Sequence, residues 1–198
     1  MMKVIDISAW QENVNWNLVK TQVDGVILKL GEYEKLDEMF IEHVNNAVAV
    51  GLPYGVYYYS HAENTADAQE EAKWVDNTIK TYLNGKTPAL GIWFDAEDND
   101  MLSGDVTAIC SKFVNYLNVA GYTYVGIYAS WNWLSSEGLH VIHLDELADY
   151  VPIWVAQYNS YNDLADEYPN KNIKVWQYTD HANIIGIPSG VDCNYYYD

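Results

Sequence analysis

The chain has 198 residues, 49% of them hydrophobic and 19% charged, which is the composition of one folded domain and not of a disordered segment. Its 28 acidic residues outnumber 10 Lys and Arg, and the resulting net charge of −18 argues against binding to nucleic acid or anionic lipid. The 18 Tyr and 8 Trp residues suit carbohydrate binding, because an aromatic ring covers the C–H face of a pyranose, although most of these rings are expected to fill the core.

Apolar segments of strand length alternate with amphipathic segments as far as residue 130. Strands are predicted over residues 3–8, 25–31, 54–60, 89–95 and 124–130. Helices are predicted over residues 15–22, 37–51, 65–83 and 105–120. The segment 65–83 is the clearest helix, since Asn64 or Thr65 can cap its start and Gly85 follows its end.

The alternation weakens in the last third of the chain. A short helix is expected at 144–150, followed by strands at 151–158, 173–179 and 190–197 that are separated by loops and not by helices. Five successive strand–helix units predict parallel strands with right-handed crossovers, and about eight strands can close a barrel. We therefore predict an α/β fold, an irregular TIM-like barrel in a single domain spanning 1–198. An open doubly wound sheet is the alternative, but no G-x-G-x-x-G or P-loop motif supports nucleotide binding there.

The cysteines and the apolar segments indicate where in or outside the cell the protein acts. Cys110 and Cys193 are far apart in the sequence and form no C-x-x-C motif, so we expect two free thiols. Asp6 interrupts the N-terminal apolar segment, which argues against a secretory leader. The apolar stretch 47–59 is too short to cross a bilayer. We expect a soluble protein that acts inside the cell or leaves it by another route.

Carboxylates recur near the ends of the predicted strands. Asp6 lies near the end of the first strand, Asp95 and Glu97 follow the fourth, and Asp192 lies on the last. Chemistry in such barrels occurs at the C-terminal ends of the strands, so these acids are expected at one rim. Residues two apart on a strand face the same side, and one of two carboxylates sharing a site has a raised pKa. An acid beside a charged carboxylate is the pair that glycoside cleavage uses.

Two other interpretations of the stretch GIWFDAEDND (91–100) remain open at this point. It can be a solvated acidic loop that caps the next helix, and we assign Asp98 and Asp100 to such a loop without a catalytic role. A calcium loop starting at Asp95 or Asp98 lacks the required Gly and terminal Glu. The histidines, which would support a metal site, are scattered along the sequence: His43, His61, His140, His143 and His181. We predict neither a metal nor a cofactor.

Nine motifs occur in an order and spacing that match one known family. They are VIDISAWQ (4–11), WNLVK (16–20), GVILKLGE (25–32), AVGLPYGVYYYS (49–60), FDAED (94–98), GIYAS (126–130), IWVAQYN (153–159), VWQYT (175–179) and GVDCN (190–194). With these motifs the chain resembles glycoside hydrolase family 25, the Chalaropsis-type lysozymes, over nearly its whole length. The resemblance implies a (β/α)5(β)3 barrel that hydrolyses the β-1,4 bond between N-acetylmuramic acid and N-acetylglucosamine in peptidoglycan.

The resemblance also implies roles for the four acids. Glu97 would be the general acid and then the base, and Asp95 would orient the reacting N-acetyl group of the sugar. Asp6 and Asp192 match two further acids of the family's pocket, which tune its charge and geometry. We favour a route in which the acetamide oxygen of the substrate attacks the anomeric carbon, giving net retention without an enzyme nucleophile.

Subsite details are less well defined by the resemblance. The family's Thr-Glu-Gly after the second strand is Gly31-Glu32-Tyr33 here, and Tyr58 stands where members often have His. The loss of that Gly predicts a different local turn. Side chains expected to contact sugar, unless they only pack the barrel, are Tyr57, Tyr59, Tyr128, Trp154, Glu32 and Gln177.

Three other functions fit the sequence less well than a lysozyme does. A non-catalytic peptidoglycan-binding barrel would not require the intact set of four acids. A chitinase motif D-x-x-D-x-D-x-E ending at Glu97 would need acids where Trp93 and Leu90 stand, and a metal-dependent deacetylase would need histidines near the acids. The expected partner is the glycan strand of peptidoglycan, with no nucleic acid, no membrane insertion and a monomeric domain. We expect a C-terminal wall-binding module to be missing from this chain. A phage endolysin held in the host cytoplasm until its release, or an autolysin at the cell wall, fits these expectations.

Overall fold

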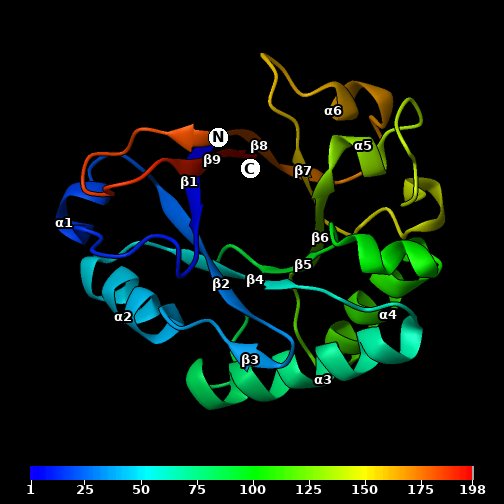
Figure 1. Ribbon diagram of the computed structural model, residues 1–198, viewed down its shortest axis with the longest axis horizontal. Coiled ribbons are helices and arrows are strands. Elements are labelled where there is room, and N and C mark those ends of the chain that lie inside the picture. The colour runs from blue at the N-terminus through cyan, green and yellow to red at the C-terminus, as the bar shows by residue number, and fades with distance from the viewer. Residues whose placement is uncertain (198) are drawn as a thin grey trace.

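The computed structural model describes residues 1–197, and eight of its strands close into a barrel (Figure 1). Around the barrel the strands follow the order β1-β9-β8-β7-β6-β5-β4-β2, and β1 pairs with β2 to complete the circle. The barrel strands are β1 (Met2–Ile7), β2 (Gly25–Glu32), β4 (Tyr54–Tyr59), β5 (Ile92–Asp95), β6 (Val125–Ser130), β7 (Ile153–Ala156), β8 (Ile173–Ala182) and β9 (Val191–Tyr196). The prediction of an α/β barrel in one domain is therefore confirmed.

Helices cover the outside of this barrel. They are α1 (Trp16–Val19), α2 (Phe40–Val50), α3 (Thr65–Tyr82), α4 (Val106–Val119), α5 (Trp131–Leu134) and α6 (Asp163–Glu167), with 3-10 turns η1 (Asn99–Ser103) and η2 (Leu144–Glu146). Figure 1 shows the long helices α2, α3 and α4 on the side of β2, β4 and β5, away from β8 and β9. Within the described part of the chain, no helix combines the length and the apolar character that crossing a bilayer requires.

The long helices start and stop where the sequence indicates. The Asn64 side chain accepts hydrogen bonds from the backbone N–H groups of Ala66 (2.9 Å) and Asp67 (3.1 Å), which satisfies two free donors at the start of α3. Asp105 caps α4 in the same way. Gly51 ends α2 with a φ of +77°, a left-handed conformation that glycine adopts at low cost.

Alternating side chains of β5 serve two different cores. Ile92 and Phe94 point outward and pack beneath the helices, whereas Trp93 belongs to the cluster that fills the barrel interior. A Cβ atom at Gly126 would lie 2.5 Å from the Trp93 ring, so the glycine on neighbouring β6 makes room for the indole. Asp95, two residues after Trp93, faces the same interior and lies nearer the barrel end than the Trp93 ring.

The structure corrects several local predictions. The helix expected at 144–150 is only the three-residue turn η2, and the helix that follows β6 is α5. A short helix, α6, lies between β7 and β8 where only a loop was expected. The two thiols are free and buried, as predicted.

The last strand runs antiparallel to both of its neighbours, β1 and β8. The start of β9 therefore lies at the same end of the barrel as the end of β1. Asp192 is paired in register with Asp6 for this reason, although 186 residues separate them in the sequence.

The β2 strand continues into a hairpin that packs beside α3. Its second arm, β3 (Lys35–Leu36), pairs antiparallel with Gly31 and Glu32. A Cβ atom at Gly31 would lie 2.0 Å from the carbonyl oxygen of Lys35, so only glycine permits this close approach. The hairpin is where the family's Thr-Glu-Gly pattern is altered.

Candidate active site

A pocket of about 290 Å³ opens at the end of the barrel where the parallel strands finish. Its lining residues are Asp6, Tyr57, Asp95, Glu97, Tyr128, Trp154, Tyr158, Gln177, Asp180 and Asp192. The four predicted acids thus meet in one place, together with Tyr57, Tyr128, Trp154 and Gln177. Burial of this many carboxylates side by side raises their pKa values, because each charged form loses water and meets like charge.

Asp6 is held by two amide side chains deep in the pocket. The Asn194 amide donates to Asp6 Oδ2 over 2.7 Å, and the Gln177 amide donates to the same oxygen over 3.1 Å. Both partners are buried, so neutral donors replace the water that this carboxylate has lost. Asn194, which lies on β9, was not predicted as a site residue.

The aromatic residues of the pocket fix the orientation of those two amides. Tyr128 and Tyr158 donate their hydroxyl protons to the Gln177 carbonyl oxygen, at 3.1 and 3.0 Å. The Trp154 indole N–H donates to the Asn194 carbonyl oxygen at 2.8 Å. These bonds leave both amide N–H₂ groups directed at Asp6. Trp154 and Tyr128 are also packed in the barrel interior, so they line the pocket and support it at once.

Asp6 and Asp192 form a coupled pair of acids. Burial raises the pKa of Asp6 to about 6, and hydrogen bonds from Asn194, Gln177 and Asp192 hold it from rising further. Burial, the charge of Asp6 and the hydrogen bond to Asp6 raise the pKa of Asp192 to about 8. Near neutral pH, Asp192 therefore keeps its proton and shares it with the Asp6 carboxylate.

Asp95 and Glu97 form the second pair. Burial and then the charge of Glu97 raise the pKa of Asp95 well above its usual range, while Lys29 lowers it in part. The Glu97 side chain reaches solvent at the mouth, but its carboxyl lies among the pocket residues. Partial burial and then the charge of Asp6 raise the pKa of Glu97, whereas the charge of Lys29 lowers it. Within residues 1–197, Asp95 Oδ1 is buried and has no hydrogen-bond partner.

Two predicted sugar contacts lie outside this pocket. Glu32 forms an ion pair with Lys29 (3.2 Å between Oε2 and Nζ) and lines a neighbouring cavity. The Tyr59 hydroxyl donates to Asp98 Oδ2 at 3.1 Å, and the Lys29 ammonium lies 5.2 Å from the centre of the Tyr59 ring. Glu32 therefore holds the Lys29 ammonium group by an ion pair, and Tyr59 contacts both Lys29 and the loop that follows β5.

Sequence reasoning missed Lys29, Tyr158 and Asp180. Lys29 lies near the end of β2 and is the cation whose charge acts on both Asp95 and Glu97. Tyr158 follows β7, and Asp180 lies near the end of β8, so both are at the same end of the barrel. The expectation that site residues lie at strand ends could therefore have identified them.

The expectation that the histidines lie far from the acids is wrong for His61. Its Nδ1 lies 3.3 Å from Asp98 Oδ2, and its Nε2 lies 3.7 Å from Glu32 Oε2. Ligand atoms of His61, Asp98 and Asp100 come within 4.8 Å of one another. This cluster stands beside the pocket, and clustered acids of this kind are common without an ion. Asp98 and Asp100 do not line the catalytic pocket, in accord with their assignment to the loop.

The model of the Glycosyl hydrolases family 25 matches residues 5–187. The chain belongs to this family. No curated protein sequence matched the chain.

Solved structures with the same fold include the modular autolysin LytC from Streptococcus pneumoniae, with 29% identity and a TM-score of 0.79. That match covers 99% of this chain but 46% of LytC, so the chain spans about half the length of that protein. The catalytic domain of the endolysin ply40, from a bacteriophage of Listeria monocytogenes, is 29% identical with a TM-score of 0.79, covering 100% of this chain and 94% of that one. The bacterial lysozyme from Streptomyces coelicolor, 22% identical with a TM-score of 0.79, shares the fold over 99% of this chain and 92% of its own.

The protonation of Asp192 makes a prediction about stability. An unfolded Asp ionises near its ordinary pKa of 3.8, whereas the folded carboxyl keeps its proton up to about pH 8. Its contribution to stability is therefore full below pH 4 and is lost as pH rises toward 8. Asp192→Asn keeps a donor for Asp6 without a charge, so it should raise the unfolding free energy by about 1–2 kcal/mol at pH 9, roughly 2–8 °C in Tm.

Thermal denaturation across this pH range measures the effect. The difference between Asp192→Asn and the wild type should shrink as pH falls toward 4. The matched control is Asp100→Asn, because Asp100 is an exposed acid outside the pocket. It should give no comparable pH-dependent gain in Tm. A constant difference at every pH would contradict the shared proton.

Proposed function

We propose that this chain is a lysozyme, an N-acetylmuramidase that hydrolyses the β-1,4 bond between N-acetylmuramic acid and N-acetylglucosamine in peptidoglycan. The observation that carries the proposal is the meeting of Asp95 and Glu97 with Asp6 and Asp192 in one pocket of a family 25 barrel. The proposal is also supported by the two structures at 29% identity, an autolysin and an endolysin.

Glu97 is the general acid in this proposal. Burial raises its pKa, which favours the protonated form, and its position at the pocket mouth allows the carboxyl to reach the glycosidic oxygen of an extended glycan. As the bond between the anomeric carbon and this oxygen breaks, the proton passes from Glu97 to the leaving oxygen. Glu97 is then a carboxylate, and it accepts a proton from the water that completes hydrolysis.

Asp95 orients the N-acetyl group on the other side of the reacting carbon. Its buried Oδ1 is an acceptor without a partner within residues 1–197, and an acetamide N–H is a donor that would satisfy it. Holding the N–H directs the acetamide oxygen toward the anomeric carbon, where it forms a cyclic oxazolinium-like species. Water then attacks that carbon from the face that the leaving group vacated, which gives net retention.

Asp6 and Asp192 set the electrostatic background of this chemistry. The Asp6 anion disfavours a second charge on Glu97, so it helps to keep the acidic proton in place before the reaction. Lys29 has the opposite effect on Asp95 and Glu97, and it limits the cost of the charge that Glu97 acquires later. The pocket therefore favours a protonated Glu97 without making its ionised form inaccessible.

The proposal also covers the substrate, the place of action and the source of affinity for the cell wall. The substrate is the glycan strand, and the place of action is the bacterial cell wall. We propose that wall affinity comes from a separate module, because the strongly negative catalytic domain is poorly suited to anionic wall polymers. A phage endolysin and a bacterial autolysin both fit these properties.

Glu97→Gln tests the catalytic assignment. The variant keeps the size of the side chain but cannot donate the proton, so turnover of Gram-positive cell walls should fall by about 10²–10⁴-fold. Asp100→Asn, in the same acidic run but outside the pocket, should retain activity. Mass spectrometry of wild-type products should show reducing-end N-acetylmuramic acid. Reducing-end N-acetylglucosamine, cleaved peptides or an active Glu97→Gln variant would refute the proposal.

Stereochemistry tests the role of the acetamide. Participation of the N-acetyl group predicts that the first-formed product has the β configuration of the substrate bond. Proton NMR recorded in the first minutes of hydrolysis, before mutarotation, distinguishes the two anomers. A first-formed α anomer would show inversion and would exclude the substrate-assisted route.

A further inference from the structure

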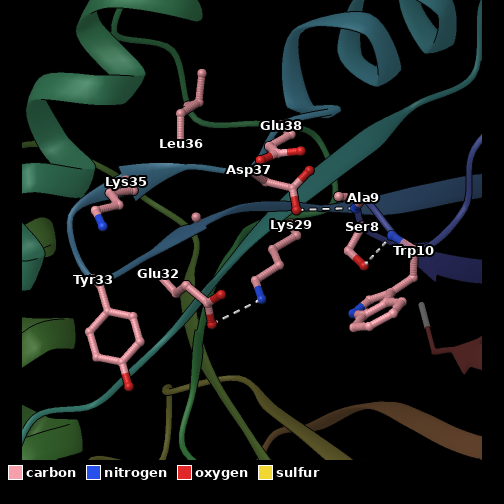
Figure 2. Close-up of a pocket in the computed structure, with 11 residues that line it drawn as sticks. Ser8, Ala9, Trp10, Lys29, Glu32, Tyr33, Lys35, Leu36, Asp37 and Glu38 are labelled. Atoms are coloured by element: carbon pink, nitrogen blue, oxygen red, sulfur yellow. Dashed lines mark hydrogen bonds and ion pairs between the residues drawn. The ribbon is translucent and has the colours of Figure 1, made fainter.

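A second cavity, of about 380 Å³, lies beside the catalytic pocket. It is formed by the loop after β1, which carries Trp10, and by the hairpin of β2 and β3, which carries Glu32 and Tyr33. Figure 2 shows Trp10 and Tyr33 on opposite sides of this cavity, with the ion pair of Lys29 and Glu32 between them. The proposed chemistry and its predicted sugar contacts use Lys29 and Glu32 but neither Trp10 nor Tyr33.

The two cavities share no lining residue, but they are neighbours at the same end of the barrel. On β1 and the residues after it, Asp6 lines the catalytic pocket and Ser8, two residues later, lines the second cavity. Lys29 lines the second cavity, yet its charge acts on Asp95 and Glu97 in the first. A linear polymer bound across Glu97 and extending past Lys29 would therefore enter the second cavity.

The side chains of Trp10 and Tyr33 are exposed to solvent and can contact a ligand. Trp10 is 86% exposed and Tyr33 is 57% exposed, so neither contributes appreciably to the core. Exposed rings at the edge of a polar cavity offer flat apolar faces of the kind that stack on a pyranose. The backbone N–H of Ala9 donates to Asp37 Oδ2 at 3.1 Å, which ties the Trp10 loop to the hairpin side of the cavity.

Tyr33 occupies its position at a conformational cost. Its φ is +47° and that of Glu34 is +49°, a left-handed conformation that favours glycine. The Tyr33 ring stacks on His61 with centroids 3.6 Å apart and planes 10° apart, which fixes the ring beside the cavity. The bulk of an aromatic ring is thus kept where the backbone would prefer glycine.

The charges in the cavity are mixed in sign. Lys29 and Lys35 line it together with Glu32, Asp37 and Glu38. An anionic or a cationic ligand would meet like charge somewhere in this ring, whereas an uncharged polyhydroxylated ligand can accept from the ammonium groups and donate to the carboxylates. The lining therefore favours a neutral sugar ring over the charged stem peptide of peptidoglycan.

We propose that this cavity is a further saccharide subsite, which binds a neutral pyranose ring of the glycan strand beyond the two sugars of the cleaved bond. Trp10 provides the stacking face, Tyr33 forms the opposite wall, and the pair of Lys29 and Glu32 binds hydroxyl groups. This subsite rests on the proposed muramidase function. It predicts that the enzyme prefers glycans long enough to reach from Glu97 to Trp10.

Peptide-free oligomers of alternating N-acetylglucosamine and N-acetylmuramic acid test the subsite. The wild type should cleave an octasaccharide with a higher kcat/KM than a tetrasaccharide. Trp10→Ala should lower kcat/KM for the octasaccharide by about fivefold to tenfold, the size of one aromatic contact, through KM and not through kcat. Cleavage of the tetrasaccharide should be unchanged, and so should the Tm of the protein.

Tyr33→Gly provides a second variant with a different structural consequence. Glycine adopts the left-handed conformation of residue 33 at a lower cost than tyrosine, so the Tm of the variant should equal or exceed that of the wild type. Its preference for long glycans should decline. Tyr150→Ala is the matched control, because Tyr150 is 65% exposed but precedes β7 at the opposite end of the barrel. It should leave the preference intact.

The outcomes separate this subsite from the proposed function. A wild type that cleaves neither oligomer refutes the muramidase proposal, and the subsite with it. A wild type that cleaves both, with Trp10→Ala showing an unchanged preference, refutes the subsite alone. A preference that appears only when the glycan carries stem peptides would assign the cavity to the peptide and would also refute the saccharide subsite.

Discussion

The structure depends on the crowding of four carboxyl groups, those of Asp6 and Asp95 buried, at one end of the barrel. Removing carboxylates from water and placing them together disfavours their charged forms, so the fold has to supply compensation or leave protons bound. It does both. Neutral amides from Asn194 and Gln177 stabilise the Asp6 anion, while Asp192 keeps a proton up to about pH 8. The same crowding raises the pKa of Glu97, and a carboxyl group with a raised pKa is what the general acid of glycoside cleavage requires.

Strand direction and side-chain alternation create this crowding. The antiparallel β9 places Asp192 opposite Asp6, and the alternation of β5 places Asp95 above the buried Trp93. Tyrosine and tryptophan side chains then orient the amides that hold Asp6. Lys29 connects this arrangement to the neighbouring cavity, because its charge acts on the catalytic pair while Glu32 holds its ammonium group. Lys29 is therefore common to the polar network of the pocket and to the proposed saccharide subsite.

The sequence was sufficient for the elements with strong periodic patterns and for the acids at strand ends. Strand alternation predicted the inward direction of Asp95, but β5 ends at this residue, so the prediction that Glu97 shares the strand was wrong although its carboxyl still lines the pocket. The helix expected at 144–150 was wrong because so short an amphipathic pattern does not specify a helix against a turn. The contact of His61 with Asp98 depends on how the segments after β4 and β5 meet, which local sequence does not encode, whereas Lys29 and Glu32 form their ion pair within β2. The positive φ of Tyr33 was also beyond prediction, because tyrosine has little preference for that conformation.

Carboxyl carbon NMR of the protein labelled with ¹³C in Asp and Glu, recorded across a pH titration, tests the central claim most directly. Glu97 is assigned by the signal that disappears in Glu97→Gln, and Asp192 by the signal that disappears in Asp192→Asn. Shared burial predicts that Asp192 titrates near pH 8 and that the titration of Glu97 lies above its ordinary value of 4.5. Titration of both groups at the ordinary values of exposed carboxylates would contradict the account.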